Sequence, residues 1–234
     1  MNGFKKAVLA TTAAMVLGLA ANAQAILVDD FDNGFFPGIN DSTIDGVGVT
    51  NGPTAIGAGD TTLTNNMRTV TVMKTGGLTG DVEAFIADSR YRHNQDDDVL
   101  GYSEVKWTFS SEDFDADGSF AVLVNVVSCD LCGNVPSPTI SFTLFTGATA
   151  SNTITNSLPG VGAYLFNYGG FAGAGFDINN VTMALMKIDG SAVSSLDLSV
   201  DLVGTAVPEP TSLLLFGSGL VGLGYLARRK HQKA

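Results

Sequence analysis

The chain has 234 residues, a length that fits one medium-sized domain with appended segments, because domains typically contain ~100–200 residues. Charged residues make up 15% and hydrophobic residues 45% of the sequence, and the mean hydropathy is +0.24. This composition argues against a disordered polyelectrolyte and favours membrane-going segments. The 23 acidic and 12 basic residues give a net charge of −11, which excludes nucleic acid as a partner because its binding depends on neutralising phosphates.

The first 25 residues have the layout of a secretory signal peptide. Lys5 and Lys6 form a short basic region, an apolar stretch follows over residues 7–21, and two small-x-small sites end at Ala23 and Ala25. The alternative, a retained membrane helix, would require a longer apolar run, since a span needs about 20 residues. The sequence therefore predicts export and cleavage by signal peptidase after Ala25, with Ala23 as the second choice.

The middle of the chain shows period-2 alternation of apolar and polar residues, which is typical of half-buried strands. Strands are predicted at 26–28, 69–74, 82–87, 104–109, 120–127, 140–144, 164–167, 181–188 and 196–202. Asn-Gly, Gly-Gly, Asp-Gly and Pro pairs separate them. The pattern predicts an all-β, antiparallel β-sandwich or jelly roll over residues 26–206.

Two further expectations concern this domain. Segment 32–66 is rich in Gly, Asn, Thr and Asp, and we expect a long loop region with few strands there. The aromatic core candidates are Trp107, Phe109, Phe120, Phe142, Phe166 and Phe176.

The C-terminal segment combines a hinge, an apolar run and a basic tail. Residues 211–227 contain no charge and would form a helix of about 25 Å at 1.5 Å per residue, at the short end of what spans a bilayer. The basic tail 228–234 follows directly, with Arg228, Arg229 and Lys230 as stop-transfer residues that keep this end cytoplasmic by the positive-inside rule. The sequence predicts a transmembrane helix, inserted in the inner membrane with the β domain outside.

The run Val207-Pro208-Glu209-Pro210, the apolar glycine-containing helix and the Arg-Arg-Lys cluster occur in that order at the C-terminus. Residues 207–234 thereby resemble the PEP-CTERM sorting signal of Gram-negative bacteria. The resemblance implies recognition by an exosortase, a membrane cysteine transpeptidase that would cut near 208–210. It also implies delivery to the envelope or extracellular matrix and an association with exopolysaccharide or biofilm. An ordinary tail anchor with a proline-rich hinge is the alternative.

The opening Val28-Asp29-Asp30-Phe31 and the closing Phe176-Asp177-Ile178-Asn179-Asn180-Val181-Thr182 give a second resemblance, to galactose-binding-like jelly rolls of the carbohydrate-binding type. It implies a fold, whereas a sugar site must be argued from residues. Residues 26–210 hold six basic and all 23 acidic side chains, a net charge of −17, so the exported domain should repel acidic polysaccharides unless divalent cations bridge them.

Two acidic groups are candidates for a calcium site. Asp113, Asp115 and Asp117 have the D-x-D-x-D-G spacing of a calcium loop, but position twelve is Val124 where an EF-hand needs glutamate. A solvated acidic turn is the alternative, and the same choice applies to the second group. That group would join acids of the first strand to one on the last: Asp29, Asp30, Asp32 and Asp201. The run 96–98 is interpreted as a solvated loop.

Cys129 and Cys132 are the only cysteines. In an exported β domain they are interpreted as a small structural disulfide. A catalytic oxidoreductase is the alternative, although the helix N-terminus that usually lowers a thiol pKa is missing.

Catalytic machinery is sparse, so we expect a non-enzymatic protein without a cofactor. His93 is the only histidine of the exported domain and is interpreted as a surface residue of a polar loop. A secreted carbohydrate-binding or glycan-hydrolysing protein is the alternative, using paired carboxylates or exposed aromatic rings that stack on sugars. The aromatic candidates are Tyr91, Tyr102, Tyr164, Tyr168 and Phe171.

Overall fold

A computed structural model of the chain describes residues 25–32, 36–116 and 118–207. The predicted signal peptide before Ala25, the membrane helix 211–227, the sorting motif from Pro208 onward, the stop-transfer residues 228–230 and Asp117 lie outside these ranges. Within them, no helix has the length and apolarity needed to cross a membrane. Residues Ala25–Ala206 form one compact unit.

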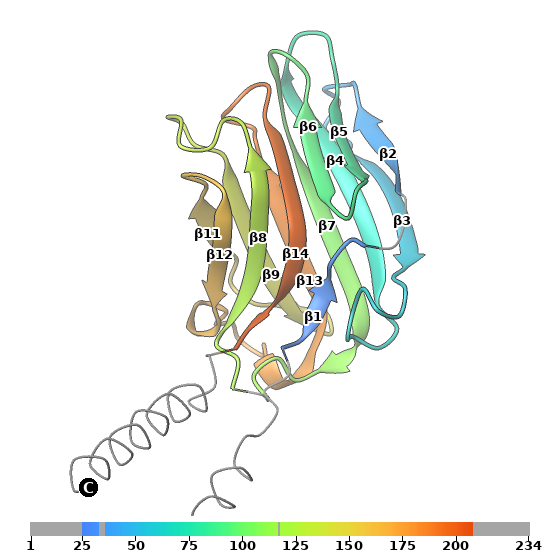
Figure 1. Cartoon of the computed structure of the whole chain (residues 1–234), viewed down its shortest axis with the longest axis vertical. Helices are drawn as coiled ribbons and strands as arrows, with labels where there is room; N and C mark the ends of the chain where they lie inside the picture. The colour runs from blue at the N-terminus through green and yellow to red at the C-terminus, as the bar shows by residue number, and fades with distance from the viewer. Residues whose placement is uncertain (1–24, 33–35, 117, 208–234) are drawn as a thin grey trace, which may run out of the picture. The chain divides into compact units, whose positions relative to one another are not determined.

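The compact unit is an antiparallel β-sandwich, as the alternation predicted (Figure 1). The first sheet has seven strands in the order β12-β8-β14-β6-β5-β2, with β1 paired to β14. Its strands are β1 (Leu27–Asp29), β2 (Phe36–Asp41), β5 (Val82–Ile86), β6 (Tyr91–Gln95), β8 (Ala121–Cys129), β12 (Gly162–Asn167) and β14 (Asp197–Ala206).

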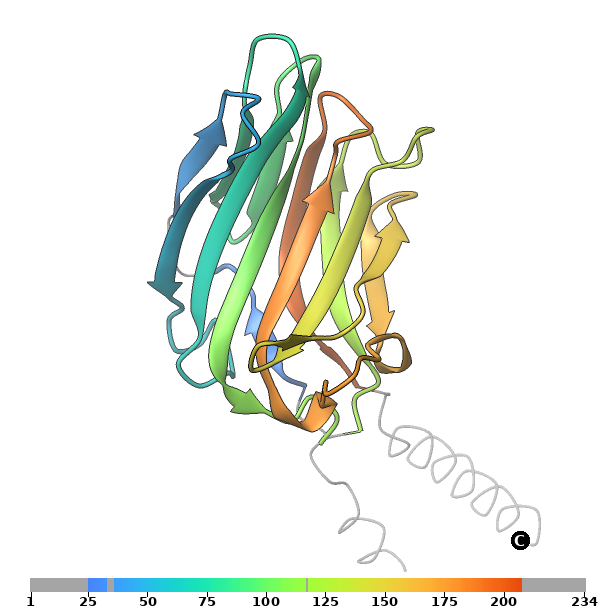
Figure 2. The ribbon, with the colours of Figure 1, turned by 180° about the vertical axis from the view of Figure 1, so that it is seen from behind.

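The second sheet forms the other layer and is seen from its outer face in Figure 2. It has the order β10-β9-β13-β7-β4-β3, with β11 paired to β9. Its strands are β3 (Val49–Ala55), β4 (Met67–Gly77), β7 (Val99–Glu112), β9 (Thr139–Thr146), β10 (Thr149–Ala150), β11 (Ile154–Ser157) and β13 (Val181–Asp189). Two short 3₁₀ helices, Tyr168–Gly170 and Ile178–Asn180, complete the described elements.

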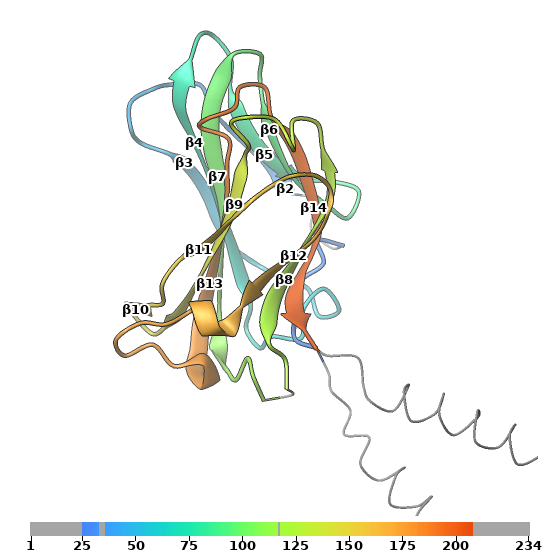
Figure 3. The ribbon, with the colours of Figure 1, turned by 90° about the vertical axis from the view of Figure 1, so that its left-hand side faces the viewer.

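The edge-on view separates the two layers (Figure 3). The chain crosses between them repeatedly, because consecutive strands such as β6, β7, β8 and β9 belong to alternate sheets. This arrangement places the first strand beside the last, with Leu27 opposite Gly204 in the antiparallel β1–β14 pair.

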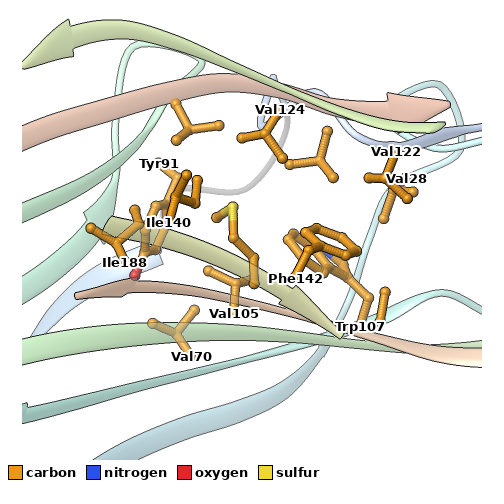
Figure 4. Packing of buried hydrophobic residues seen from close by; sticks show 14 of the residues in the cluster. Val28, Val70, Tyr91, Val105, Trp107, Val122, Val124, Ile140, Phe142 and Ile188 are labelled. Carbon is orange, nitrogen blue, oxygen red and sulfur yellow. The ribbon is translucent and has the colours of Figure 1, made fainter. Parts of the chain in front are cut away.

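The core fills the space between the sheets with the inward residues of both (Figure 4). Trp107 and Phe142 stack with ring centroids 6.3 Å apart, and Phe142 also contacts Phe166 at 5.5 Å. All three are fully buried, and aromatic side chains of this size each bury roughly 150–250 Å². Alternating apolar and polar residues give each sheet one apolar face. The two sheets pack together because these apolar faces are buried against each other.

Segment 32–66 contains few strands, as expected: of its described residues, those of β2 and β3, at the edges of the two sheets, form the named strands. One expectation about the aromatic core is wrong. Phe120 is 42% exposed, since it precedes the first residue of β8 at the end of the sheet. The other aromatic core candidates are buried or packed against the core.

Candidate functional site

A polar groove of about 800 Å³ lies on the outer side of the first sheet. Four strands form its floor, because Asn40 of β2, Glu83 of β5, Asn94 of β6 and Asp197 of β14 are successive cross-strand neighbours. Such neighbours on one face have Cβ atoms ~4.5–5.5 Å apart. The sheet thus presents a row of two amides and two carboxylates to solvent.

The walls of the groove are two turns that are hydrogen-bonded to each other. One is the β4–β5 turn with Leu78, Thr79 and Asp81, and the other is the β6–β7 turn, residues 96–98. The Asp81 amide donates to Asp96 Oδ2 at 2.8 Å, and the Asp96 amide donates to the Asp81 carbonyl at 3.0 Å. Asn40 Nδ2 donates to Asp81 Oδ2 at 2.6 Å and so connects the wall to the floor.

Gly80 permits the close approach of these two turns. Its φ of +126° lies in the region that favours glycine, and a Cβ at this position would come within 2.7 Å of Asp96 Cβ. A residue with a side chain would push the two turns apart.

The buried side chain of Lys74 is hydrogen-bonded to the backbone of the β4–β5 turn. Its side chain is only 3% exposed, and Nζ donates to the carbonyls of Leu78 and Gly80, each at 2.8 Å, and to the Ser42 carbonyl at 3.4 Å. A buried ammonium group with several carbonyl partners is satisfied without a carboxylate. Lys74 therefore fixes the backbone of the wall.

The groove is strongly acidic. Six carboxylates line it, those of Asp81, Glu83, Asp96, Asp97, Asp98 and Asp197, and none of the described lining residues is Lys, Arg or His. Partial burial raises the pKa of Asp197, and the charges of Asp130 and Asp96 raise it further. The surface thus offers many hydrogen-bond acceptors in a field that repels anions.

The two cysteines lie next to the groove. Cys129 and Cys132 form a disulfide that closes the turn containing Asp130. The Asp130 amide donates to the Asp197 carbonyl at 3.1 Å, and the Asp197 amide donates to Asp130 Oδ1 at 2.9 Å. The closed turn therefore holds the end of β14 that carries a floor residue.

The predicted calcium loop comes together in part. Asn179 Nδ2 donates to Asp113 Oδ1 at 3.1 Å and to Asp115 Oδ1 at 2.8 Å, so an amide bridges the two carboxylates. Burial and the neighbouring Asp113 raise the pKa of Asp115. No group of three or more potential metal ligands occurs in the part of the chain that the structure describes, and Asp117 lies outside it.

The second calcium hypothesis is contradicted by the position of Asp29. This carboxylate is fully buried, and its Oδ2 accepts from Arg68 Nη1 at 2.6 Å and from Trp107 Nε1 at 2.8 Å. Asp201 accepts instead from Asn125 Nδ2 at 2.9 Å. The first and last strands do pair, but a guanidinium group supplies the positive charge beside Asp29.

Several residues interpreted as surface groups belong to the interior. His93 is fully buried within β6, where its Nδ1 lies 2.9 Å from Ser103 Oγ of the opposite sheet. Among the aromatic candidates, Tyr91 and Phe171 are buried in the core, and Tyr164 and Tyr168 are partly buried against it. These four rings therefore do not form an open stacking surface for sugars.

The groove itself was missed by the sequence analysis. Its floor residues come from four strands that are far apart in the chain, so no local motif marks it. The one available signal was the acidic run 96–98, which is exposed as the solvated-loop interpretation expected and also forms a wall of the groove.

The comparisons with known proteins concern the two parts of the chain separately. The PEP-CTERM protein-sorting motif matches residues 206–230, so the chain carries this motif. No curated protein matches the chain.

Among solved structures, the chain is similar to the family 11 carbohydrate-binding module of the cellulosomal cellulase Lic26A-Cel5E of Clostridium thermocellum. The identity is 12% and the TM-score 0.38, over 80% of this chain and 98% of that one. A second structure of such a module, in complex with a β-1,3-1,4-mixed-linked tetrasaccharide, matches at 12% identity and a TM-score of 0.35, covering 78% and 95% of the two chains. A solution structure of CtCBM11 matches at 14% identity and a TM-score of 0.39, covering 82% and 99%.

Proposed function

We propose that this is an exported, non-enzymatic protein of the cell surface or extracellular matrix, sorted by an exosortase and associated with exopolysaccharide. The observation that carries the proposal is the PEP-CTERM motif at residues 206–230. The predicted signal peptide supports it, because a sorting signal of this type acts on a chain that has been exported.

The intact mass of the protein from envelope and medium tests the sorting step. In a strain with the exosortase, we expect a product that begins at Ile26 and ends near residues 208–210. Without the exosortase, this product should be absent. A species that retains residues 228–234 in both strains would instead identify a plain tail-anchored membrane protein.

We further propose that the groove binds a hydroxyl-rich glycan that is uncharged or carries amines. Carboxylates accept hydrogen bonds from hydroxyl and ammonium groups, whereas the amides of Asn40 and Asn94 can both donate and accept. Leu78 adds an apolar surface for the C–H faces of a sugar ring. Polyanionic glycans are disfavoured because the groove contains six carboxylates.

Calorimetry on residues 26–210 can test the binding with a neutral β-glucan oligomer, a glucosamine oligomer and an alginate oligomer. Asn94→Ala should weaken binding of the preferred oligomer about two- to tenfold, the effect of losing a single hydrogen bond. Asn125→Ala is the matched control, because Asn125 lies on the same sheet but does not line the groove. Equal affinities of the two variants would refute the proposed location of the site.

Glycan hydrolysis is the second candidate, and the positions of Glu83 and Asp197 favour it. Both flank Asn94 in the cross-strand row, so their strands are about 9–10 Å apart at two spacings of ~4.8 Å. Inverting glycosidases separate their two carboxyl groups by about 6.5–9.5 Å. The release of new reducing ends from a bound oligomer, abolished by Asp197→Asn, would replace the binding proposal with an enzyme.

A further inference from the structure

The end of β14 is held in the sandwich from both sides. On one side, the Thr205 amide donates to the Ile26 carbonyl at 2.8 Å, and the Ile26 amide donates to Thr205 Oγ1 at 2.8 Å. On the other side, Ala206 is paired with Ala121, and the Phe120 amide donates to the Ala206 carbonyl at 3.1 Å. Thr205 is only 5% exposed. The last residues of β14 are thus paired on both sides.

The sorting motif follows this strand without a linker. β14 ends at Ala206, and the Val-Pro-Glu-Pro run begins at Val207. Cleavage of a polypeptide is favoured in exposed, unpaired backbone, because the enzyme must bind an extended segment on both sides of the bond that it cuts. For a cut near residues 208–210, the segment on the N-terminal side includes residues that are paired to β1 and β8.

We infer that the last residues of β14 control the sorting cleavage: the exosortase acts on the folded domain only when residues 204–206 have separated from β1 and β8. This inference rests on the proposed sorting function and adds the conformational step that limits its rate. Strand ends open locally at a lower free energy than the whole domain. When opening and closing are fast, cleavage follows the population of the open form. The hydrogen bonds between Ile26 and Thr205 then slow the sorting cleavage, because they lower the population of the open form.

Two variants of the full-length chain, expressed with the exosortase, test this effect on the cleavage rate by pulse-chase and intact mass. Thr205→Val keeps the side-chain shape and removes the acceptor of the Ile26 backbone nitrogen, which is the N-terminal amino group once the predicted signal peptide has been cleaved after Ala25. We expect cleavage to become about two- to tenfold faster, the effect of one hydrogen bond on the open population. Thr71→Val is the matched control, because it removes one side-chain hydrogen bond, to Thr50, in the second sheet.

The second variant inserts Gly-Ser-Gly-Ser between Ala206 and Val207, which supplies an unpaired segment without changing the domain. It should be cleaved at least as fast as Thr205→Val. The same insertion at Gly147, in the turn between β9 and β10, should leave the rate unchanged, since this turn is open and belongs to the second sheet, whereas β14 belongs to the first.

The outcomes separate this inference from the function on which it rests. Exosortase-dependent cleavage at equal rates in the wild type and both variants would overturn the inference and leave the sorting function intact, because the enzyme would then act before the domain folds. The absence of any exosortase-dependent product from the wild type would overturn both. Faster cleavage of both variants but not of their controls would support the inference that pairing of residues 204–206 limits the cleavage rate.

Discussion

The buried histidine predicts a specific acid sensitivity of the β domain. His93 is fully enclosed, Nδ1 is hydrogen-bonded to Ser103, and Nε2 has no hydrogen-bond partner among the described residues. Burial lowers its pKa from the ordinary 6.5 to about 4, and the charge of Asp189 offsets only part of this effect. The folded protein therefore keeps His93 neutral at pH values where an unfolded chain would bind a proton.

The sign and size of the effect follow from this difference. Above pH 6.5 neither state binds the proton, so the full stability is present. As the pH falls from 6.5 towards 4, the unfolded state is protonated first and stability is lost. The pKa of His93 is about 2.5 lower in the folded than in the unfolded state. Since one pKa unit corresponds to about 1.4 kcal/mol, the free energy of unfolding should fall by about 3 kcal/mol at pH 4.

Urea unfolding of residues 26–210 at several pH values, followed by the fluorescence of Trp107, measures this loss. Carboxylates also titrate in this range, so the relevant quantity is the difference in unfolding free energy between wild type and His93→Leu. That difference should change by about 3 kcal/mol between pH 7.5 and pH 4, in favour of the leucine variant at low pH. Parallel pH profiles for the two proteins would show that His93 does not titrate as its burial requires, and would refute the reasoning.

Two other substitutions test the interactions that hold the sandwich and the groove wall. Asp29→Asn leaves the Arg68 guanidinium buried without its counter-charge and should cost about 3–5 kcal/mol in urea unfolding; Asp32→Asn, at an exposed position, should cost less than about 0.5 kcal/mol. Gly80→Ala should cost at least about 1 kcal/mol and abolish groove binding, because φ is positive and the added Cβ meets the facing turn. Gly46→Ala has a positive φ but no atom within 4 Å of the added Cβ, so binding by this control should be unchanged.

Alternation revealed the strands whose inward residues are apolar and missed those with a polar interior. In β7 the inward Val105, Trp107 and Phe109 mark the strand clearly. In β6 the inward residues are Tyr91, His93 and Gln95, all buried. No hydropathy pattern distinguishes such a strand from a polar loop, because the hydrogen-bond partners of His93 Nδ1 and Gln95 Nε2 lie on another strand.

Those partners depend on register, which is a tertiary property. Ser103, which meets His93, and the Gly101 carbonyl, which accepts from Gln95 Nε2 at 2.9 Å, both lie in β7 of the opposite sheet. The groove floor has the same origin, since only the pairing of four strands places its residues in one row. The sorting motif was found from sequence alone because its chemistry depends on consecutive residues.

One strand connects the two proposed activities of the protein. β14 begins at Asp197 in the groove floor and ends at Ala206, one residue before the Val-Pro-Glu-Pro run. Nine residue steps of about 3.3 Å place these ends roughly 30 Å apart. A glycan in the groove would thus lie at the opposite end of β14 from Ala206, the strand residue that precedes the sorting motif. Cleavage or transfer near residues 208–210 would then leave the groove unobstructed, so sorting and glycan binding can operate on the same folded domain.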